Sequence, residues 1–262
     1  MTIGKKIGVG RSAQVFCWGD RQVIKLFPQK TLAAFIKYET WVTKFAYQAG
    51  LPVPHVEGVI EIEGRKGIVS ERILGNSMLT NIRLKPWKIF YFARLLAELQ
   101  TQIHQCSIPK LPSLKYQRKL QIEAVKVLPL EQRQQILNLL DRLPTGQSLC
   151  HGDFHPDNII LSPNKSTIID WSGAVQGNPL ADVARTLLLL SFGNTPTNLT
   201  WIPLMFFRGL FCAVYLQRYL KLNHVTWKQV TPWLATEAAA WLSYCASGKE
   251  QRFLLLVIKK LL

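Results

Sequence analysis

Acidic side chains are scarce in this sequence. Sixteen Asp and Glu residues stand against 32 Lys and Arg, which gives a formal net charge of +16 over 262 residues. Such an excess attracts anionic ligands, and it disfavours a polycationic ligand unless an acidic pocket offsets the field locally. Charged residues make up only 18% of the chain and apolar residues 48%. The composition therefore argues against a largely disordered protein and predicts a sizeable core.

Paired cysteines and long apolar runs are also missing. The five cysteines are scattered and contain no CxxC pair, which argues against a disulfide framework or a zinc site and favours buried, reduced thiols in the cytoplasm. Residues 1–11 hold no apolar signal core. The longest apolar stretch, Leu199 to Leu216, contains Pro203 and Arg208 and falls short of the roughly 20 apolar residues of a membrane span. We expect it to form a buried helix.

Short apolar runs separated by turn residues dominate the first 74 residues. They predict strands at residues 3–7, 14–18, 22–27, 56–61 and 67–73, with a tight hairpin at Gly19-Asp20. Apolar residues at helical spacing predict a helix over residues 32–49 between these strands. From residue 75 the pattern becomes helical, most clearly over residues 87–104, 130–143 and beyond 181. The sequence thus predicts an α+β fold with a β-rich lobe at 1–74 and a mainly helical lobe at 75–262.

One polar loop between short apolar runs carries carboxylates and an amide. It reads HGDFHPDN over residues 151–158, and Asp170 follows twelve residues after Asn158, directly behind two isoleucines. Phosphoryl transfer needs a group that orients and deprotonates a hydroxyl, and it needs oxygen ligands for Mg²⁺. Asp153 suits the first task, whereas Asn158 and Asp170 suit the second. The loop therefore predicts a phosphoryl-transfer site.

This loop, together with the Ile-Asp-Trp at residues 169–171, resembles the signature of the aminoglycoside phosphotransferase and choline kinase superfamily. That superfamily shares the fold of eukaryotic protein kinases, and the match is particularly good to bacterial phosphotransferases with an HGDFHPxN loop. The resemblance runs from residue 3 to residue 190 or so. It implies a two-lobed protein-kinase-like fold and a cytoplasmic enzyme that moves the γ-phosphate of ATP, with Mg²⁺, to a hydroxyl of a small molecule. GTP in place of ATP stays open.

The resemblance also assigns roles within the loop. It implies that Asp153 is the catalytic residue and that His155 either touches the γ-phosphate or orients the loop. His151 is expected to hold the loop in shape. Asp182, in the Gly-Asn-Pro-Leu-Ala-Asp segment at 177–182, is expected to support the loop from below.

The N-terminal part carries features that agree with the same resemblance. The segment Gly-Val-Gly-Arg-Ser-Ala at 8–13 resembles the glycine-rich loop that covers nucleotide phosphates, because glycines let backbone N–H groups approach closely. Lys25 lies on the predicted strand at residues 22–27. It is similar to the lysine that pairs with the α and β phosphates. Glu39, in the predicted helix, is placed to hold Lys25 through an ion pair. The nucleotide-covering residues implied are Gly8, Gly10, Ser12 and Ala13.

The adenine would meet the chain near residue 71. By resemblance, residues 70–73 form the hinge whose backbone contacts the adenine edge, which implicates Glu71 and Ile73. Ile160 and Ile168 are candidates for the floor of the adenine pocket, and a plain core role for both stays open.

The acceptor side is poor in acids. After residue 170 the chain holds three acids, Asp182, Glu237 and Glu250, against nine Lys and Arg. A polycationic aminoglycoside would find few partners there. The many aromatic residues of this region serve either the core or the acceptor.

Two alternatives compete with a small-molecule kinase. A protein kinase would need an activation segment after Asp170, for which the sequence leaves little room. A non-catalytic pseudokinase or a basic scaffold is suggested by the +16 charge. Against it, Lys25, Asp153, Asn158 and Asp170 are all present, and no familiar nucleic-acid motif appears. No sequence feature indicates an oligomeric state.

Overall fold

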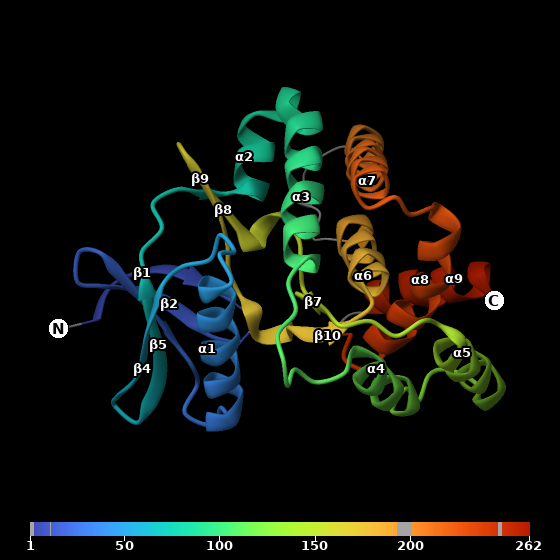
Figure 1. The fold of residues 1–262 in the computed structure, drawn as a ribbon, viewed down its shortest axis with the longest axis horizontal. Coiled ribbons are helices and arrows are strands. Elements are labelled where there is room, and N and C mark those ends of the chain that lie inside the picture. Colours follow the sequence, from blue (N-terminus) through green and yellow to red (C-terminus); the bar gives the residue numbers. More distant parts are fainter. Residues whose placement is uncertain (1–2, 11, 193–200, 246–247) are drawn as a thin grey trace. The chain divides into compact units, whose positions relative to one another are not determined.

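The computed structural model describes residues 3–10, 12–192, 201–245 and 248–262, without the side chains of 201–205. The chain forms two compact units (Figure 1). The first comprises Met1–Leu84 and Pro156–Ala174, and the second comprises Lys85–His155 and Val175–Leu262. The segment 156–174 therefore belongs to the first unit although it lies far along the chain. The lobe boundary predicted between residues 74 and 75 stays a prediction.

An antiparallel five-stranded sheet dominates the first unit. Its strand order is β1-β2-β3-β5-β4, and the five predicted strands are all present within two residues of their expected ends. Gly19 takes a positive φ of 63° in the hairpin predicted between the second and third strands, which favours glycine there. The strands are β1 (Ile3–Val9), β2 (Gln14–Trp18), β3 (Gln22–Leu26), β4 (Val56–Ile62) and β5 (Arg65–Glu71).

Helix α1 (Ala33–Gln48) covers one face of this sheet and contacts β4 and β5. On β3, Ile24 and Leu26 pack with the apolar residues of the opposite face. Phe27 instead packs with Ile36 of α1. Because successive side chains of a strand point to opposite faces, Lys25 projects to the same side as Phe27, toward α1.

A small three-stranded sheet of order β6-β8-β9 completes the first unit. Residues 159–168 form a hairpin of β8 (Ile159–Ser162) and β9 (Lys165–Ile168), with Ile159 opposite Ile168. This register brings the residues just outside the hairpin, Asn158 and Ile169, to the same end. The other elements here are β6 (Asn76–Ser77), α2 (Met78–Leu84) and short 3₁₀ helices at Pro156–Asn158 and Trp171–Gly173.

The second unit is mainly helical, as predicted. Helices α3 and α7 pack together, α6 and α9 pack against α8, and α4 and α5 also contact α8. Two short antiparallel strands, β7 (Ser148–Cys150) and β10 (Val175–Gly177), lie beside them. The helices are α3 (Ile89–His104), α4 (Leu114–Glu123), α5 (Leu130–Arg142), α6 (Pro179–Phe192), α7 (Trp201–Asn223), α8 (Trp227–Leu242) and α9 (Gly248–Leu261), preceded by a 3₁₀ turn at Pro86–Lys88.

The apolar stretch predicted as a buried helix forms α7, although its first two residues, 199 and 200, lie outside the described residues. Tyr215 and Tyr219 are buried. Phe206 and Phe207, in contrast, are 68% and 43% exposed. The prediction of a buried helix is therefore correct for one face only. None of the helices among the described residues is long and apolar enough to cross a membrane.

The five cysteines are all free, but only Cys150 is buried. Burial raises the pKa of the Cys150 thiol, which keeps it protonated and unreactive. The other four are partly exposed, so the expectation of buried thiols holds for one cysteine alone.

A buried ion pair joins α4 to α8. Nε of Arg118 donates to both carboxylate oxygens of Glu237, at 2.7 and 2.8 Å, and the two residues are 6% and 1% exposed. A second pair, Arg218 with Glu98, joins α7 to α3 at 2.6 Å, but its side chains are 36% and 41% exposed. Water screens the second pair, whereas the first must compensate its charges internally.

These two pairs predict unequal losses of stability. Glu237→Gln should lower the free energy of unfolding by roughly 3 kcal/mol, because it leaves a buried guanidinium without an opposite charge. The matched change Glu98→Gln should cost less than about 1 kcal/mol. Urea unfolding followed by circular dichroism measures both, and similar losses would contradict the importance given to the buried pair.

Candidate active site

In the first unit, Lys25 lies between two carboxylates. Its Nζ is 2.6 Å from Oε1 of Glu39 and 2.9 Å from Oδ1 of Asp170. The ion pair predicted between Lys25 and Glu39 is therefore present, and Asp170 joins it from the end of the β8–β9 hairpin. Glu39 is only 5% exposed because it sits in the buried stripe of α1, among Ile36, Val42 and Ala46.

Electrostatics keep this lysine charged. Burial alone would lower the pKa of the Lys25 ammonium, but the carboxylates of Glu39 and Asp170 outweigh it, and the pKa is raised. Oε2 of Glu39 is buried and makes no hydrogen bond within the described part of the chain. The cluster thus contains one ammonium that keeps its charge and two carboxylates beside it.

Asn158 and Asp170, the predicted metal ligands, meet at one end of the β8–β9 hairpin. The N–H of Ile169 donates to the carbonyl of Asn158 at 2.9 Å, which ties the two positions together. Asp170 has a φ of 64°, an uncommon conformation for a residue other than glycine, and its Oδ1 also accepts from the Ser172 hydroxyl at 2.9 Å. The backbone is thus bent so that the carboxylate turns back toward Lys25.

The donor atoms here suit Mg²⁺ rather than a transition metal. Within the described residues, no group of three or more His, Cys, Asp or Glu gathers as a metal site. One carboxylate, Asp170, and one amide, Asn158, supply only oxygen ligands from the protein side. Mg²⁺ is commonly bound by one or two such groups, with phosphate oxygens and water completing its shell.

The glycine-rich segment forms the turn from β1 to β2. The N–H of Gly10 donates to the carbonyl of Ala13 at 2.9 Å and closes the turn, while residue 11 is outside the described part. A Cβ at Gly8 would lie 3.5 Å from Val15, and one at Gly10 would lie 3.6 Å from the Ala13 carbonyl. These are ordinary contacts, and neither glycine has a positive φ. The fold itself therefore does not require glycine at either position, and the role predicted for Gly8 and Gly10 in covering phosphates stays a prediction. Ser12 is partly exposed in the same turn.

The hinge segment offers few free backbone donors. The N–H of Glu71 donates to His55, and the N–H of Arg72 donates to Arg21. A donor to adenine would therefore have to come from Ile73, just beyond β5. Ile160 is partly exposed on β8 and remains available to line a pocket, whereas Ile168 is fully buried and belongs to the core.

In the second unit, the HGD loop presents Asp153. Gly152 has a φ of 77°, which requires glycine for a strain-free turn. The N–H of Asp153 donates to Nδ1 of the fully buried His151 at 3.3 Å, so His151 holds the loop in shape, as predicted. Nε2 of His155 is 3.6 Å from Oδ2 of Asp153. His155 thus lies beside the predicted catalytic carboxylate, and its part in the reaction stays a prediction.

Partial burial alone would raise the pKa of Asp153. A hydrogen bond and the electrostatic interaction with His155, followed by the interactions with Arg185 and His151, outweigh it, and the pKa of Asp153 is lowered to about 2. Asp153 is therefore ionised at neutral pH. A carboxylate with so low a pKa is a weak base, which suits orientation of a hydroxyl and late acceptance of its proton.

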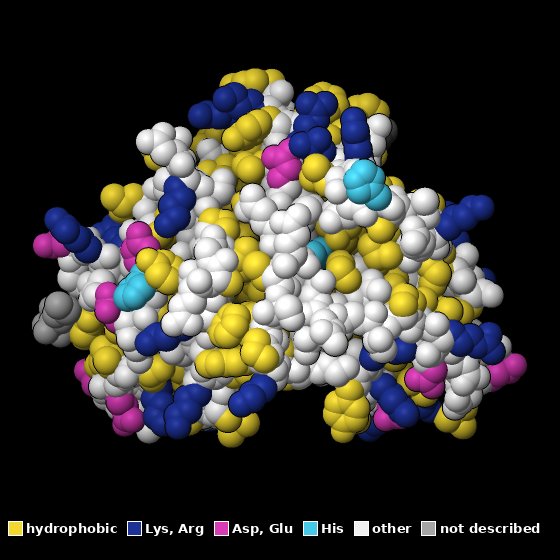
Figure 2. Space-filling model, viewed as in Figure 1, with side chains coloured by type: hydrophobic (Ala, Val, Ile, Leu, Met, Phe, Trp, Pro, Cys, Tyr) yellow, Lys and Arg dark blue, Asp and Glu magenta, His cyan; other side chains and the backbone are white. Residues whose placement is uncertain are grey.

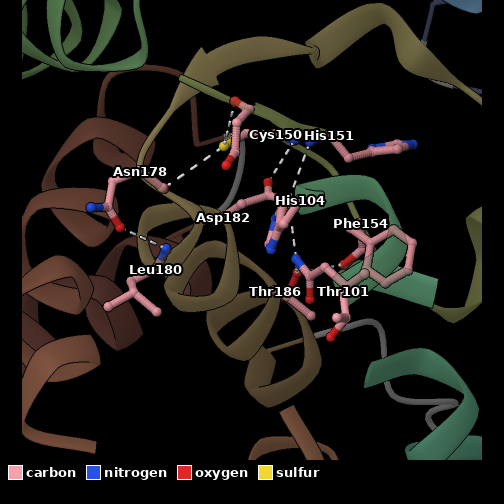
Figure 3. Close-up of polar contacts among 12 residues, drawn as sticks. Thr101, His104, Cys150, His151, Phe154, Asn178, Leu180, Asp182 and Thr186 are labelled. Atoms are coloured by element: carbon pink, nitrogen blue, oxygen red, sulfur yellow. Dashed lines mark hydrogen bonds and ion pairs between the residues drawn. The ribbon is translucent and has the colours of Figure 1, made fainter. Parts of the chain in front are cut away.

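Asp182 of α6 holds the same loop from below (Figure 3). Its Oδ1 accepts from the N–H of Gly152 at 2.7 Å and its Oδ2 from the N–H of His151 at 3.2 Å. The side chains of Gln100 and His104 also donate to Oδ2, at 3.0 and 3.1 Å. The supporting role predicted for Asp182 is confirmed. Burial would raise the pKa of this carboxyl, but these donors hold it well below its usual range.

Three residues of this region are absent from the sequence-based prediction. Gln100 and His104 lie on α3 and belong to its buried face, so their spacing resembles that of core residues. Arg185 stands in the apolar run of α6 and is 5% exposed. The only signal in the sequence was the presence of a strongly polar side chain at a buried helical position.

The Asp182 network predicts a loss of stability with a specific pH dependence. Asp182→Asn should lower the free energy of unfolding by about 2–4 kcal/mol at pH 7, because a neutral amide cannot accept from all four donors. The exposed change Asp141→Asn should alter it by less than about 0.5 kcal/mol.

The pH dependence follows from the lowered pKa of Asp182. A carboxyl with a lowered folded-state pKa stabilises the fold above its ordinary pKa, near 4, and this contribution is lost as the pH falls below that value. The difference between wild type and Asp182→Asn should therefore shrink between about pH 4 and pH 2. Urea unfolding over this range measures it, and a constant difference would contradict the assignment.

Comparisons with known proteins agree with this geometry. The chain matches the phosphotransferase enzyme family over residues 3–233. Among curated proteins, acyl-CoA dehydrogenase family member 11 of Mus musculus is 37% identical over 82 residues, which cover 26% of this chain and 10% of that protein. The chain thus spans about a tenth of that relative.

Solved structures share the fold. An amicoumacin kinase in complex with AMP-PNP and Ca²⁺ has a TM-score of 0.66 at 15% identity, with 98% of this chain and 87% of that chain covered. An aminoglycoside-3'-phosphotransferase of type VIII has a TM-score of 0.63 at 19% identity, with 93% of each chain covered. A choline kinase from Cryptosporidium parvum has a TM-score of 0.62 at 16% identity, with 98% and 90% covered.

These likenesses confirm the predicted kinase-like α+β fold. The family match covers most of the chain, including the Lys25 cluster of the first unit and the HGD loop of the second. It confirms the superfamily that the HGD loop resembles. The chain belongs to the phosphotransferase enzyme family.

Proposed function

We propose that this phosphotransferase moves the γ-phosphate of ATP, with Mg²⁺, to a hydroxyl group of a small molecule in the cytoplasm. The observation that carries the proposal is the placement of Lys25 between Glu39 and Asp170. A lysine held in this way has no structural need for two carboxylates, because one would balance its charge. The second is available to a metal ion that accompanies the nucleotide.

The first unit would bind the nucleotide. The turn from Gly8 to Ala13 would cover the phosphates with its backbone N–H groups, and Lys25 would contact the α and β phosphates. The adenine would meet the chain near Glu71 and Ile73, against Ile160. The neighbour that binds AMP-PNP supports nucleotide use by this fold.

Asp170 and Asn158 would hold the metal ion. A bound Mg²⁺ neutralises charge that builds up on the phosphate oxygens during transfer. Asp153 would orient the acceptor hydroxyl for in-line attack on phosphorus and take up its proton late. His155 would keep the carboxylate of Asp153 in position, and Asp182 would keep the loop itself in position.

A small acceptor is favoured over a protein. After Asp170 the chain forms a single 3₁₀ turn and the three-residue strand β10, and α6 already begins at Pro179. A protein kinase needs a longer activation segment at this point to bind a peptide. The short connection supports a small molecule as acceptor.

The three acids that follow residue 170 are poorly available to a cationic acceptor. Asp182 is occupied by four donors, Glu237 is bound to Arg118, and Glu250 is 6% exposed. Dark blue Lys and Arg side chains spread over the face drawn in Figure 2, with fewer magenta acids between them. These observations favour an acceptor that is not polycationic.

The roles of Asp153 and Asp170 predict different defects. Asp153→Asn should keep the affinity for Mg²⁺-AMP-PNP and lower turnover by about 10²- to 10⁴-fold, because it removes only the group that orients the hydroxyl. Asp170→Asn should lower turnover and also weaken nucleotide affinity at least roughly tenfold in the presence of Mg²⁺, since it removes a metal ligand. Calorimetric titration measures affinity, and release of ADP measures turnover.

The exposed residue Asp20 supplies the control for these variants. Asp20→Asn, in the turn between β2 and β3, removes the same charge from the same unit and should behave like wild type. Turnover that is unchanged in both Asp153→Asn and Asp170→Asn would refute catalysis and favour a pseudokinase or a basic scaffold.

The lack of available acids predicts poor activity on aminoglycosides. Kanamycin should be phosphorylated weakly or not at all, because no unpaired carboxylate of the acid-poor region can bind its amino groups. A coupled ADP-release assay, with an aminoglycoside-3'-phosphotransferase as positive control, measures this. Robust phosphorylation of kanamycin with a KM in the micromolar range would overturn the prediction.

A further inference from the structure

Helix α6 buries an arginine that leaves two of its nitrogen atoms without a hydrogen bond among the described residues. Arg185 is 5% exposed, and within the described part of the chain its Nε and Nη1 are buried and make no hydrogen bond. A guanidinium carries five N–H donors, and burying them without acceptors is unfavourable. An unsatisfied buried group of this kind in a folded protein calls for an explanation, and a missing ligand is one.

Two aromatic rings hold the guanidinium without satisfying it. Cζ of Arg185 lies 4.0 Å from the ring centre of Trp241 and 5.6 Å from that of Tyr244. The face of an aromatic ring attracts a cation but supplies no oxygen acceptor for its N–H groups. The two rings therefore stabilise the charge of Arg185 and leave its Nε and Nη1 donors unsatisfied.

The arginine lies on the part of α6 that supports the HGD loop. Asp182, one turn earlier, accepts from the loop backbone, and the hydroxyl of Thr186 donates to the carbonyl of Phe154 at 3.0 Å (Figure 3). Arg185 stands between these two contacts. Its positive charge also contributes to the lowered pKa of Asp153.

Two buried carboxylates of the second unit are already engaged by other groups. Asp182 accepts four hydrogen bonds, and Glu237 accepts two from Arg118. Among the described residues the buried Nε and Nη1 of Arg185 find no acceptor, so the oxygens of an anionic ligand would satisfy them. Arginine is well suited to this, because its fork matches the two oxygens of a carboxylate or a phosphate.

We propose that Arg185 binds an anionic group of the phosphoryl acceptor, a carboxylate or a phosphate, while Asp153 orients the acceptor's hydroxyl. This inference rests on the proposed function and names the chemical class of its substrate: a hydroxylated acid or a phosphorylated alcohol. The γ-phosphate of ATP offers the same oxyanion chemistry, so the experiment separates the two sources.

The first measurement is binding of simple anions. The nucleotide site is filled with saturating Mg²⁺-AMP-PNP, and the midpoint of thermal unfolding is recorded with acetate, with inorganic phosphate, and with chloride at equal ionic strength. At least one of the two oxyanions should raise the midpoint of the wild type above that in chloride. The rise should be absent in Arg185→Met and reduced in Arg185→Lys, which keeps the charge but loses the fork.

The control is Arg252→Met, which removes an exposed arginine from α9 and should respond like wild type. Equal protection of wild type and Arg185→Met, or no protection of wild type by either oxyanion, would overturn the proposal. Protection that disappears when AMP-PNP fills the nucleotide site would assign the anion to the γ-phosphate position and would also overturn it.

A structural role for Arg185 gives a different result. If its stacking on Trp241 were its only purpose, Arg185→Met would lower the unfolding midpoint in chloride and leave the response to oxyanions intact. The proposal expects Arg185→Met to keep the unfolding midpoint in chloride and to lose the response to oxyanions. The midpoint is kept because the substitution removes unsatisfied donors while the apolar methionine side chain still packs against the ring. Circular dichroism verifies that each variant is folded.

The second measurement is phosphoryl transfer to paired acceptors. Glycerate and glycerol 3-phosphate should be used with a higher kcat/KM than glycerol, and Arg185→Met should raise the KM for the preferred acid by about 10- to 100-fold. Equal use of glycerol and its acids would overturn the proposal. Where none of the three is turned over, the binding measurement decides. If wild type and Asp153→Asn turn over every acceptor equally, the proposed function is refuted, and the result of the anion-binding measurement is unaffected.

Discussion

A charge buried in a protein must meet an opposite charge or several hydrogen bonds, and this constraint organises both units of the chain. In the first unit, the ammonium of Lys25 is balanced by Glu39 and Asp170, which come from a helix and a hairpin far apart in the sequence. In the second, the carboxylate of Asp182 gathers α3, α6 and the HGD loop around itself. The charges of Lys25 and Asp182 therefore connect the elements that carry the candidate site residues.

This arrangement has a consequence for catalysis. Groups that bind phosphate or orient a hydroxyl are most effective when they are already in position before the substrate arrives. Asp182 fixes the backbone of residues 151 and 152, and Asp153 follows directly behind them. Lys25 is likewise held before any nucleotide binds. The same buried hydrogen bonds and ion pairs thus stabilise the fold and preorganise the candidate site.

Much of the fold and of the candidate site was predictable because it depends on local patterns. The strands, α1 and the large helices follow from apolar periodicity, and the HGD loop follows from residue types that few other chemistries require together. The pair of Lys25 with Glu39 was accessible through family resemblance. The exposed face of α7 was not predictable from the sequence, because a run of apolar residues does not reveal which of its faces another helix covers.

What the sequence could not reveal were partners distant along the chain. Gln100 and His104 look like core residues of α3, and only packing against α6 turns them into donors for Asp182. In the same way, the sequence shows that only three acids follow residue 170, but it does not show what they bind. In the structure Glu237 binds Arg118, and Asp182 binds the backbone of the HGD loop. The unsatisfied guanidinium of Arg185 is likewise visible only in the folded chain.

By itself, therefore, the sequence determined the family, the order of the elements and the residue types available for phosphoryl transfer. These properties reside in short stretches whose periodicity and chemistry are local. The tertiary structure alone decided which charges are paired and left two nitrogen atoms of Arg185 without an acceptor among the described residues. The physical reason is that Coulomb interactions and hydrogen bonds act over a few ångströms in space, and distance along the chain does not report that proximity.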